Sequence, residues 1–128
     1  MKKRYSVLTL LYCAAIFWSS SRNLPDTSIN LPFADKLVHF CIFGGLSLIA
    51  GEGILRGEKW KGRFAVYVAP IIFALLYGAS DEIHQCFVDG RTPSLADLVM
   101  DVAGAITAQF AVWRARTIDA KKMGVGQS

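Results

Sequence analysis

Hydrophobic residues along this chain are gathered into four long blocks rather than spread evenly. The blocks run over residues 5–21, 37–55, 64–80 and 95–113. Each holds roughly 17 to 20 residues, which as an α-helix measures about 25 to 30 Å, close to the hydrocarbon thickness of a bilayer. None shows the strict alternation of a membrane β-strand. The pattern predicts an all-α polytopic membrane protein, a bundle of four transmembrane helices.

Composition supports a single membrane domain. A chain of 128 residues with 53% hydrophobic and 19% charged residues is too apolar for an ordinary soluble domain of this size. We expect the four-helix transmembrane domain to cover residues 1–116 and a disordered cytoplasmic tail to cover residues 117–128. The expected helices span about residues 5–21, 36–55, 64–85 and 95–114.

The first block also has an alternative interpretation, as a cleaved secretory signal. The basic start "MKKR", the apolar core and the small residues of "SSSRN" all fit such a signal. The block is somewhat long, however, and it carries Phe17 and Trp18 where an aromatic belt of a membrane helix would lie. These features favour a retained anchor.

Basic residues are distributed unevenly between the connecting segments. Eleven of the 14 Lys and Arg fall on one side of the predicted membrane: before the first block, between the second and third, and after the fourth. Because the loops are short, the positive-inside rule places both termini in the cytoplasm. The basic isoelectric point therefore requires no nucleic acid partner, and the expected partner is the lipid bilayer.

The fourth block cannot cross a bilayer without carrying charge. Its uncharged part, residues 102–113, is only 12 residues long, so a spanning helix must include Asp101 and Asp97. Charges at membrane depth are costly and are expected to face the bundle interior and find partners. Small residues, Gly104, Ala105 and Ala108, continue the same helix face and would allow close packing.

Ionisable residues recur at helical spacing near the outer ends of three predicted helices. Asp35 and His39 are four residues apart on the second helix, as are Asp97 and Asp101 on the fourth. The third helix ends with Asp81, Glu82, His84 and Gln85, and Arg91 follows in a short loop. We expect these groups to converge on one outward-opening polar pocket.

Simpler roles exist for several of these residues. Asp35 and Asp97 lie near helix starts, where a carboxylate is favourable as a cap, and Lys36 can reach the membrane interface. A single histidine is more often a packing residue than a ligand. Asp81 and Glu82 fit less well, because the dipole at a helix C-terminus disfavours carboxylates.

Three segments at the outer ends of the predicted helices resemble the VanZ-like family of small bacterial membrane proteins. The resemblance lies in "DKLVHF", "YGASDEIHQCFVDGR" and "SLADLVMDVAGA", in that order, and covers roughly residues 33–110. Many relatives carry Asn where this chain has Asp101, so the charge of the site is not constant across the family. The motif positions carried over are Asp35, Lys36, His39, Asp81, Glu82, His84, Gln85, Arg91, Asp97 and Asp101.

The resemblance implies a multi-pass protein of the bacterial cytoplasmic (inner) membrane with a role in the cell envelope. The namesake of the family is associated with resistance to the glycopeptide teicoplanin, and its biochemical activity is not established. The foremost expectation is a protein that binds or modulates an envelope component, such as a lipid-linked precursor or a glycopeptide. A small outward-facing hydrolase or transferase acting on a lipid phosphate is the second, and a transporter or proton-coupled channel is the third.

The chemistry of the predicted pocket leaves its catalytic status open. No cofactor motif is present, and no Ser or Cys nucleophile stands in an activating motif. Oxygen and imidazole ligands are nevertheless able to hold a divalent metal ion. The candidate metal ligands are Asp81, Glu82, His84, Asp97 and Asp101.

Overall fold

The protein is a bundle of helices. The computed structural model describes residues 3–22, 33–57, 62 and 64–125, and this part of the chain contains no strand. The all-α prediction is confirmed. The elements in chain order are α1 (Lys3–Ser20), α2 (Ala34–Leu55), the π-helical turn η1 (Phe64–Val68), α3 (Ala69–Gln85) and α4 (Leu95–Val125).

Three of these helical segments are long and apolar enough to cross a membrane. They are Ala34–Leu55, Phe64–Gln85, in which η1 leads directly into α3, and Leu95–Lys122. Helix α1 (18 residues) does not qualify, because with Lys3 and Arg4 at its start it is not apolar enough. The structure therefore supports a multi-pass membrane protein with three candidate spans. The remaining predicted span, α1, is helical, but its composition does not identify it as a span.

The fourth helix is longer than predicted. It continues to Val125, so the expected end near residue 114 and the expected disorder of residues 117–125 are wrong. Residues 126–128 lie outside the described part of the chain. The stretch "RARTIDAKKM" lacks proline and glycine and is rich in Ala, Arg and Lys, which are good helix formers, so nothing local ends the helix before Gly124.

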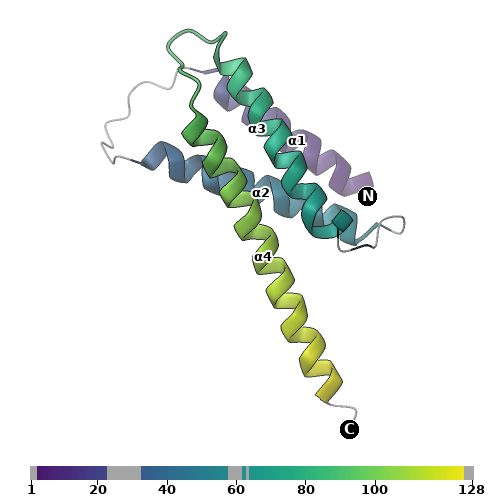
Figure 1. Cartoon of the computed structure of the whole chain (residues 1–128). Helices are drawn as coiled ribbons and strands as arrows, with labels where there is room; N and C mark the ends of the chain where they lie inside the picture. The colour runs from purple at the N-terminus through teal and green to yellow at the C-terminus, as the bar shows by residue number, and fades with distance from the viewer. Residues whose placement is uncertain (1–2, 23–32, 58–61, 63, 126–128) are drawn as a thin grey trace.

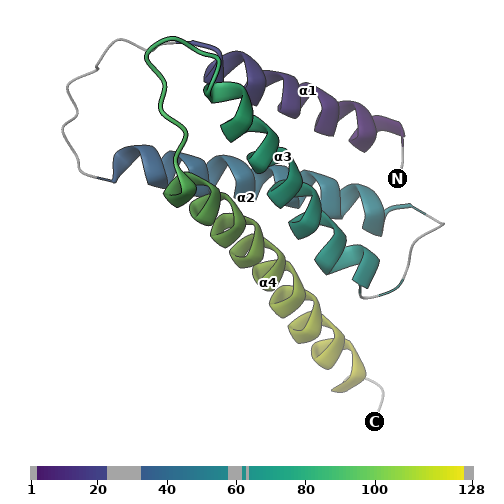
Figure 2. The same cartoon turned by 45° about the horizontal axis from the view of Figure 1, so that its top comes forward.

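The polar ends of the four helices meet at one end of the bundle. In Figures 1 and 2 the C-terminal ends of α1 and α3 lie side by side, close to the connection that leads into α4. The start of α2 lies beside the start of α4 in both views, and α2 crosses behind α3 and α4. This arrangement brings residues 20, 36, 85 and 95 to the same end, as the spacing of the polar motifs predicts.

Glycine allows α2 and α4 to approach closely where they cross. A Cβ added to Gly104 would lie 2.1 Å from the carbonyl oxygen of Phe40, and one added to Gly44 would lie 3.2 Å from the carbonyl oxygen of Gly104. Contact between backbones at such distances excludes any side chain. The prediction that the Gly104 face of the fourth helix packs against another helix is therefore confirmed, and its partner is α2.

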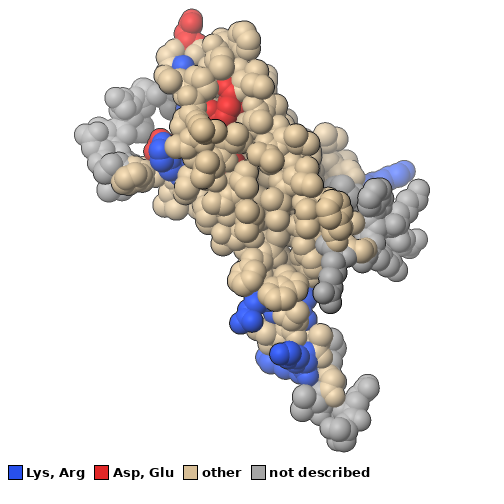
Figure 3. All heavy atoms as spheres, viewed as in Figure 1, with Lys and Arg blue, Asp and Glu red and all other residues tan. Residues whose placement is uncertain are grey.

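Apolar residues form both the small core and most of the outer surface. Ile16, Phe43, Leu46, Ala74 and Ala105 build the buried cluster between the helices. Figure 3 shows a broad uncharged belt, with Lys and Arg gathered along the far part of α4 and acidic groups at the opposite end. A belt of this kind is expected of a surface that faces lipid.

Candidate functional site

The ten predicted site residues all lie at the end of the bundle where the helices meet, and their direct contacts fall into three groups. The structure divides them into a central cluster, an ion pair between α2 and α4, and a set of contacts to the end of α1. The central cluster consists of His39, Glu82 and Asp101.

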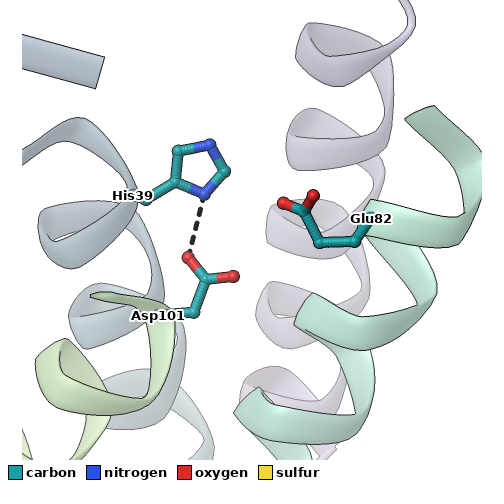
Figure 4. A group of neighbouring side chains, drawn as sticks. All are labelled: His39, Glu82 and Asp101. Carbon is teal, nitrogen blue, oxygen red and sulfur yellow. Dashed lines mark hydrogen bonds and ion pairs between the residues drawn. The ribbon is translucent and has the colours of Figure 1, made fainter. Parts of the chain in front are cut away.

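The central cluster takes one side chain from each of three helices. Figure 4 shows His39 on α2, Glu82 on α3 and Asp101 on α4 directed toward one another. His39 Nδ1 lies 2.9 Å from Asp101 Oδ1, within hydrogen-bonding distance, and one ligand atom from each of the three residues lies within 4.8 Å of the others. The sequence spacing predicted this convergence for His39 and Asp101, which are separated by 62 positions in the chain.

Two carboxylate oxygens in this cluster are buried without a partner. Asp101 is 1% exposed and Glu82 is 8% exposed. Glu82 Oε2 accepts a hydrogen bond of 2.6 Å from the backbone N–H of Ser94, whereas Glu82 Oε1 and Asp101 Oδ2 have no hydrogen-bond partner among the described residues. Buried acceptors are nearly always satisfied in native proteins, so an unpaired pair at one place is unusual.

A glycine on α3 makes room for the Asp101 carboxylate. A Cβ added to Gly78 would lie 2.7 Å from Asp101 Oδ2 and 3.3 Å from a ring carbon of Phe43. Gly78 is one turn before Glu82, and both residues lie on the face of α3 that is directed toward α4. The free oxygen of Asp101 therefore lies against α3 rather than toward lipid.

Lys36 joins the start of α2 to the start of α4. Its Nζ lies 3.0 Å from Asp97 Oδ1 and 2.9 Å from Asp35 Oδ2. The N-cap residue of α2, Phe33, has a left-handed conformation with φ of 95° and makes no side-chain cap hydrogen bond. Asp35 lies in the first turn of α2, where the helix dipole favours a carboxylate, and its side chain pairs with the neighbouring lysine.

Asp81 binds the end of α1 instead of the central cluster, and Gln85 binds Asp81. Ser20 Oγ donates a hydrogen bond of 2.6 Å to Asp81 Oδ1, and Gln85 Nε2 donates one of 3.1 Å to Asp81 Oδ2. Both oxygens of this buried carboxylate are therefore paired, which offsets its unfavourable position at the C-terminal end of α3.

His84 and Arg91 also contact the end of α1. His84 Nε2 lies 2.9 Å from Ser21 Oγ, and its ring lies 4.3 Å from that of Phe17. Arg91 Nη2 donates to the backbone carbonyl oxygens of Ser19 and Arg22 at 3.5 and 3.3 Å. A guanidinium beside the free carbonyls of a helix C-terminus is a favourable arrangement, so Arg91 stabilises the end of α1.

The sequence analysis did not identify the serines that form hydrogen bonds with Asp81, Glu82 and His84. Ser20 and Ser21 lie in the run "SSSR", which was interpreted as the small residues of a signal sequence. Ser94 directly precedes α4, and its Oγ accepts a hydrogen bond of 3.4 Å from the Asp97 N–H. Its second role, donating its own N–H to Glu82, has no signal in the sequence.

The predicted metal ligands are divided between these groups. Glu82 and Asp101 lie together, but the third donor beside them is His39, which was not among the predicted ligands. Asp81 and His84 contact α1, and Asp97 pairs with Lys36. Two carboxylates and one imidazole can bind a metal ion or the ammonium group of a ligand. Two neighbouring carboxylates repel a bare phosphate, so an anion would enter this cluster only together with a cation.

Comparison with known proteins identifies the family of the chain. No curated protein and no solved structure matches it significantly. A sequence model of the VanZ/LLP1 family matches residues 3–116, which include all four helices apart from the last turns of α4 and all ten predicted site residues. The chain therefore belongs to the VanZ/LLP1 family.

Proposed function

We propose that this protein is a four-span protein of the bacterial cytoplasmic membrane whose outward-facing polar end binds a component of the cell envelope. The observation that carries this proposal is the pair of buried, unpartnered oxygens of Glu82 and Asp101 beside His39. Ionisable groups at membrane depth are costly and are retained mainly where they serve a function.

The charge distribution supports the proposed orientation. At the end of the bundle away from the cluster, the Arg56 guanidinium lies 5.8 Å from the ring centre of Tyr5, and Arg116 lies 3.9 Å from Glu52. Arg4 of α1 lies 4.9 Å from the same ring centre, so Arg4, Arg56 after α2 and Arg116 of α4 gather at one end. The positive-inside rule assigns this end to the cytoplasm.

Exposed apolar side chains support α1 as the fourth span. Leu10, Leu11 and Trp18 are 69%, 62% and 64% exposed in the isolated chain. A helix that packs against α2 and α3 on one side and exposes leucine on the other is suited to lipid contact. Its charged start would then lie at the cytoplasmic surface.

The orientation is tested with a reporter that is active only outside the cytoplasm. Fusion after Ser128 should give no activity, whereas insertion within residues 23–31 should give a strong signal. The opposite pattern would refute the proposed topology. The mass of the mature chain tests the signal-peptide alternative, since cleavage would shorten it by about 20 residues.

Binding is favoured over hydrolysis by the state of the one Ser–His contact at this end. Ser21 Oγ lies 2.9 Å from His84 Nε2, but the hydroxyl donates its proton to the Phe17 carbonyl at 2.6 Å. A nucleophilic serine needs its proton directed to the base. The hydrogen bond of Ser21 to the Phe17 carbonyl favours a packing role over a serine nucleophile, and the enzyme, with or without a metal, remains the second candidate.

A transporter is the third candidate because the buried polar groups deeper in the bundle are neutral. Gln109 Nε2 donates to the backbone carbonyl and hydroxyl of Ser47 at 2.8 and 2.9 Å. This pair fixes α4 to α2 without an ionisable group, whereas a proton relay would need one at that depth.

The binding proposal is tested with a defined lipid. The purified protein in detergent is titrated with a polyisoprenyl phosphate, with phosphatidylglycerol as the control lipid, and the thermal unfolding midpoint is measured. We expect the polyisoprenyl phosphate to raise the midpoint of the wild type and to have little effect on Asp101→Asn. Equal shifts in both proteins, or none in the wild type, would refute the proposal.

The resemblance to VanZ-like proteins extends the proposal to glycopeptide tolerance. If the bound component is a cell-wall precursor, expression of the wild type should raise tolerance to teicoplanin, and Glu82→Gln should lose this effect at unchanged membrane abundance. The comparison requires both proteins to be present in equal amounts, as measured by immunoblotting of membranes.

A further inference from the structure

The unsatisfied oxygens of the central cluster receive no hydrogen bond from Lys36 or Arg91. Lys36 is engaged by Asp35 and Asp97, and Arg91 Nη2 is engaged by carbonyl oxygens at the end of α1. Glu82 Oε1 and Asp101 Oδ2 therefore receive no positive charge or proton donor from these two groups.

Glu82 and Asp101 are each held in place by a contact that leaves one oxygen free for a ligand. His39 Nδ1 is engaged by Asp101 Oδ1 and would exchange this contact for the ligand. The Ser94 N–H binds Glu82 Oε2 and leaves Oε1 free. His39 binds Asp101 Oδ1 and leaves Oδ2 free. Figure 4 shows the carboxylate of Glu82 directed at the pair formed by the other two residues. Oriented donors of this kind, supported by a second contact, are typical of metal sites.

We propose that His39, Glu82 and Asp101 bind one divalent transition-metal ion. The three residues come from three helices, and one donor atom of each already lies within 4.8 Å of the others. Small side-chain rotations bring such atoms to the roughly 2.0 to 2.2 Å bonds that zinc forms with nitrogen and oxygen ligands. The ion would give the free oxygens of Glu82 and Asp101 a positively charged partner.

The ligand set indicates the class of ion. Calcium and magnesium prefer oxygen ligands alone, whereas imidazole suits zinc and other transition metals and carboxylate suits manganese. One histidine with two carboxylates therefore favours Zn²⁺ or Mn²⁺. Three protein ligands leave at least one coordination position open, as in metal sites that bind a substrate or ligand.

The open position gives the ion a role in ligand binding. A lipid phosphate, which the carboxylates alone would repel, can coordinate the ion directly. This second step rests on the proposed function, whereas binding of the ion itself does not.

The ion is tested by loading the purified protein. Protein stripped with chelator is incubated with Zn²⁺ or Mn²⁺ in detergent, desalted, and its metal content measured by mass spectrometry. We expect about one equivalent in the wild type and a loss of affinity of at least roughly tenfold in Glu82→Gln and Asp101→Asn. Asp81→Asn is the matched control, because Asp81 is a neighbouring buried carboxylate with both oxygens paired, and it should retain the ion.

A spectroscopic measurement on the wild type tests the proposal even if the variants fail to fold. Co²⁺ added to the stripped wild type should give visible absorption bands of nitrogen and oxygen coordination, and stoichiometric Zn²⁺ should remove them. Absence of stoichiometric metal in the loaded wild type, or equal retention by Glu82→Gln and Asp101→Asn, would overturn the proposal.

The polyisoprenyl phosphate titration separates this proposal from the proposed function. Binding of the lipid only after metal loading supports both. Lipid binding of equal strength in excess chelator overturns the bridging role and leaves the proposed function standing. Stoichiometric metal without any lipid binding supports the ion and contradicts the proposed function.

Discussion

Asp81 and Glu82 are neighbours on α3 and are similarly buried, yet their surroundings differ. Both oxygens of Asp81 accept hydrogen bonds, from Ser20 and from Gln85. Glu82 has one oxygen bound by the Ser94 N–H and one that faces Asp101 without a partner. Burial alone therefore does not distinguish a structural carboxylate from a candidate ligand. For these two carboxylates, the distinction is whether both oxygens have a partner.

The two regions also depend on different helices. The region around Asp81 joins α3 to the end of α1, whereas the region around Glu82 joins α3 to α2 and α4 through His39 and Asp101. Substitutions in one set of contacts should therefore affect one region more than the other.

The largest effect is expected where α2 and α4 cross beneath the Glu82 region. In Gly104→Leu, the new Cβ would lie 2.1 Å from the carbonyl oxygen of Phe40, which is too close for both atoms to keep their positions. Overpacking typically costs about 1–3 kcal/mol and more where the contact is backbone, so we expect loss of a monodisperse folded protein in detergent. Size-exclusion chromatography of the solubilised membrane fraction measures this.

Ala103→Leu is the control for that substitution. Ala103 is half-buried and lies about 100° around the helix from Gly104, so the added side chain can extend away from α2. Equal loss of folded protein in both variants would mean that the crossing is not the cause.

A smaller effect is expected from removing the partner of Asp81. Ser20→Ala deletes the hydroxyl that donates to Asp81 Oδ1 at 2.6 Å. Hydrogen bonds to charged groups contribute about 1.5–3 kcal/mol, so the unfolding midpoint should fall clearly while metal content after loading stays unchanged.

Ser21→Ala provides the comparison on the next residue. Ser21 Oγ contacts His84 at a half-exposed position, where a neutral hydrogen bond contributes about 0.5–1.5 kcal/mol. Its midpoint should fall less than that of Ser20→Ala. The reverse order would indicate that His84, and not Asp81, holds α1 against α3.

Much of this arrangement was predictable from the sequence. The length and apolar character of the blocks predicted the helices of residues 34–55, 64–85 and 95 onward, and helical spacing placed the ionisable residues at one end. The Gly104 face predicted a close helix contact. These predictions succeeded because they depend on local periodicity and on the high cost of burying charge.

The pairing of individual residues was not predictable in the same way. Helical spacing shows which side chains share a face, but it does not show which helix lies opposite. Asp81 and Glu82 are adjacent, and the sequence could not show that one would contact α1 and the other α4. The extension of α4 to Val125 was missed because charge was interpreted as an end of helix rather than as the end of the apolar segment.

The central claim is that Asp81 is a satisfied structural carboxylate and Glu82 an unsatisfied one. The most direct test measures the thermal unfolding midpoints of wild type, Asp81→Asn and Glu82→Gln in excess chelator. Glu82→Gln removes a buried charge and can donate to Asp101, so its midpoint should rise, whereas Asp81→Asn loses a charge-assisted hydrogen bond and its midpoint should fall. Midpoints that move in the same direction, or a fall in Glu82→Gln alone, would contradict the account.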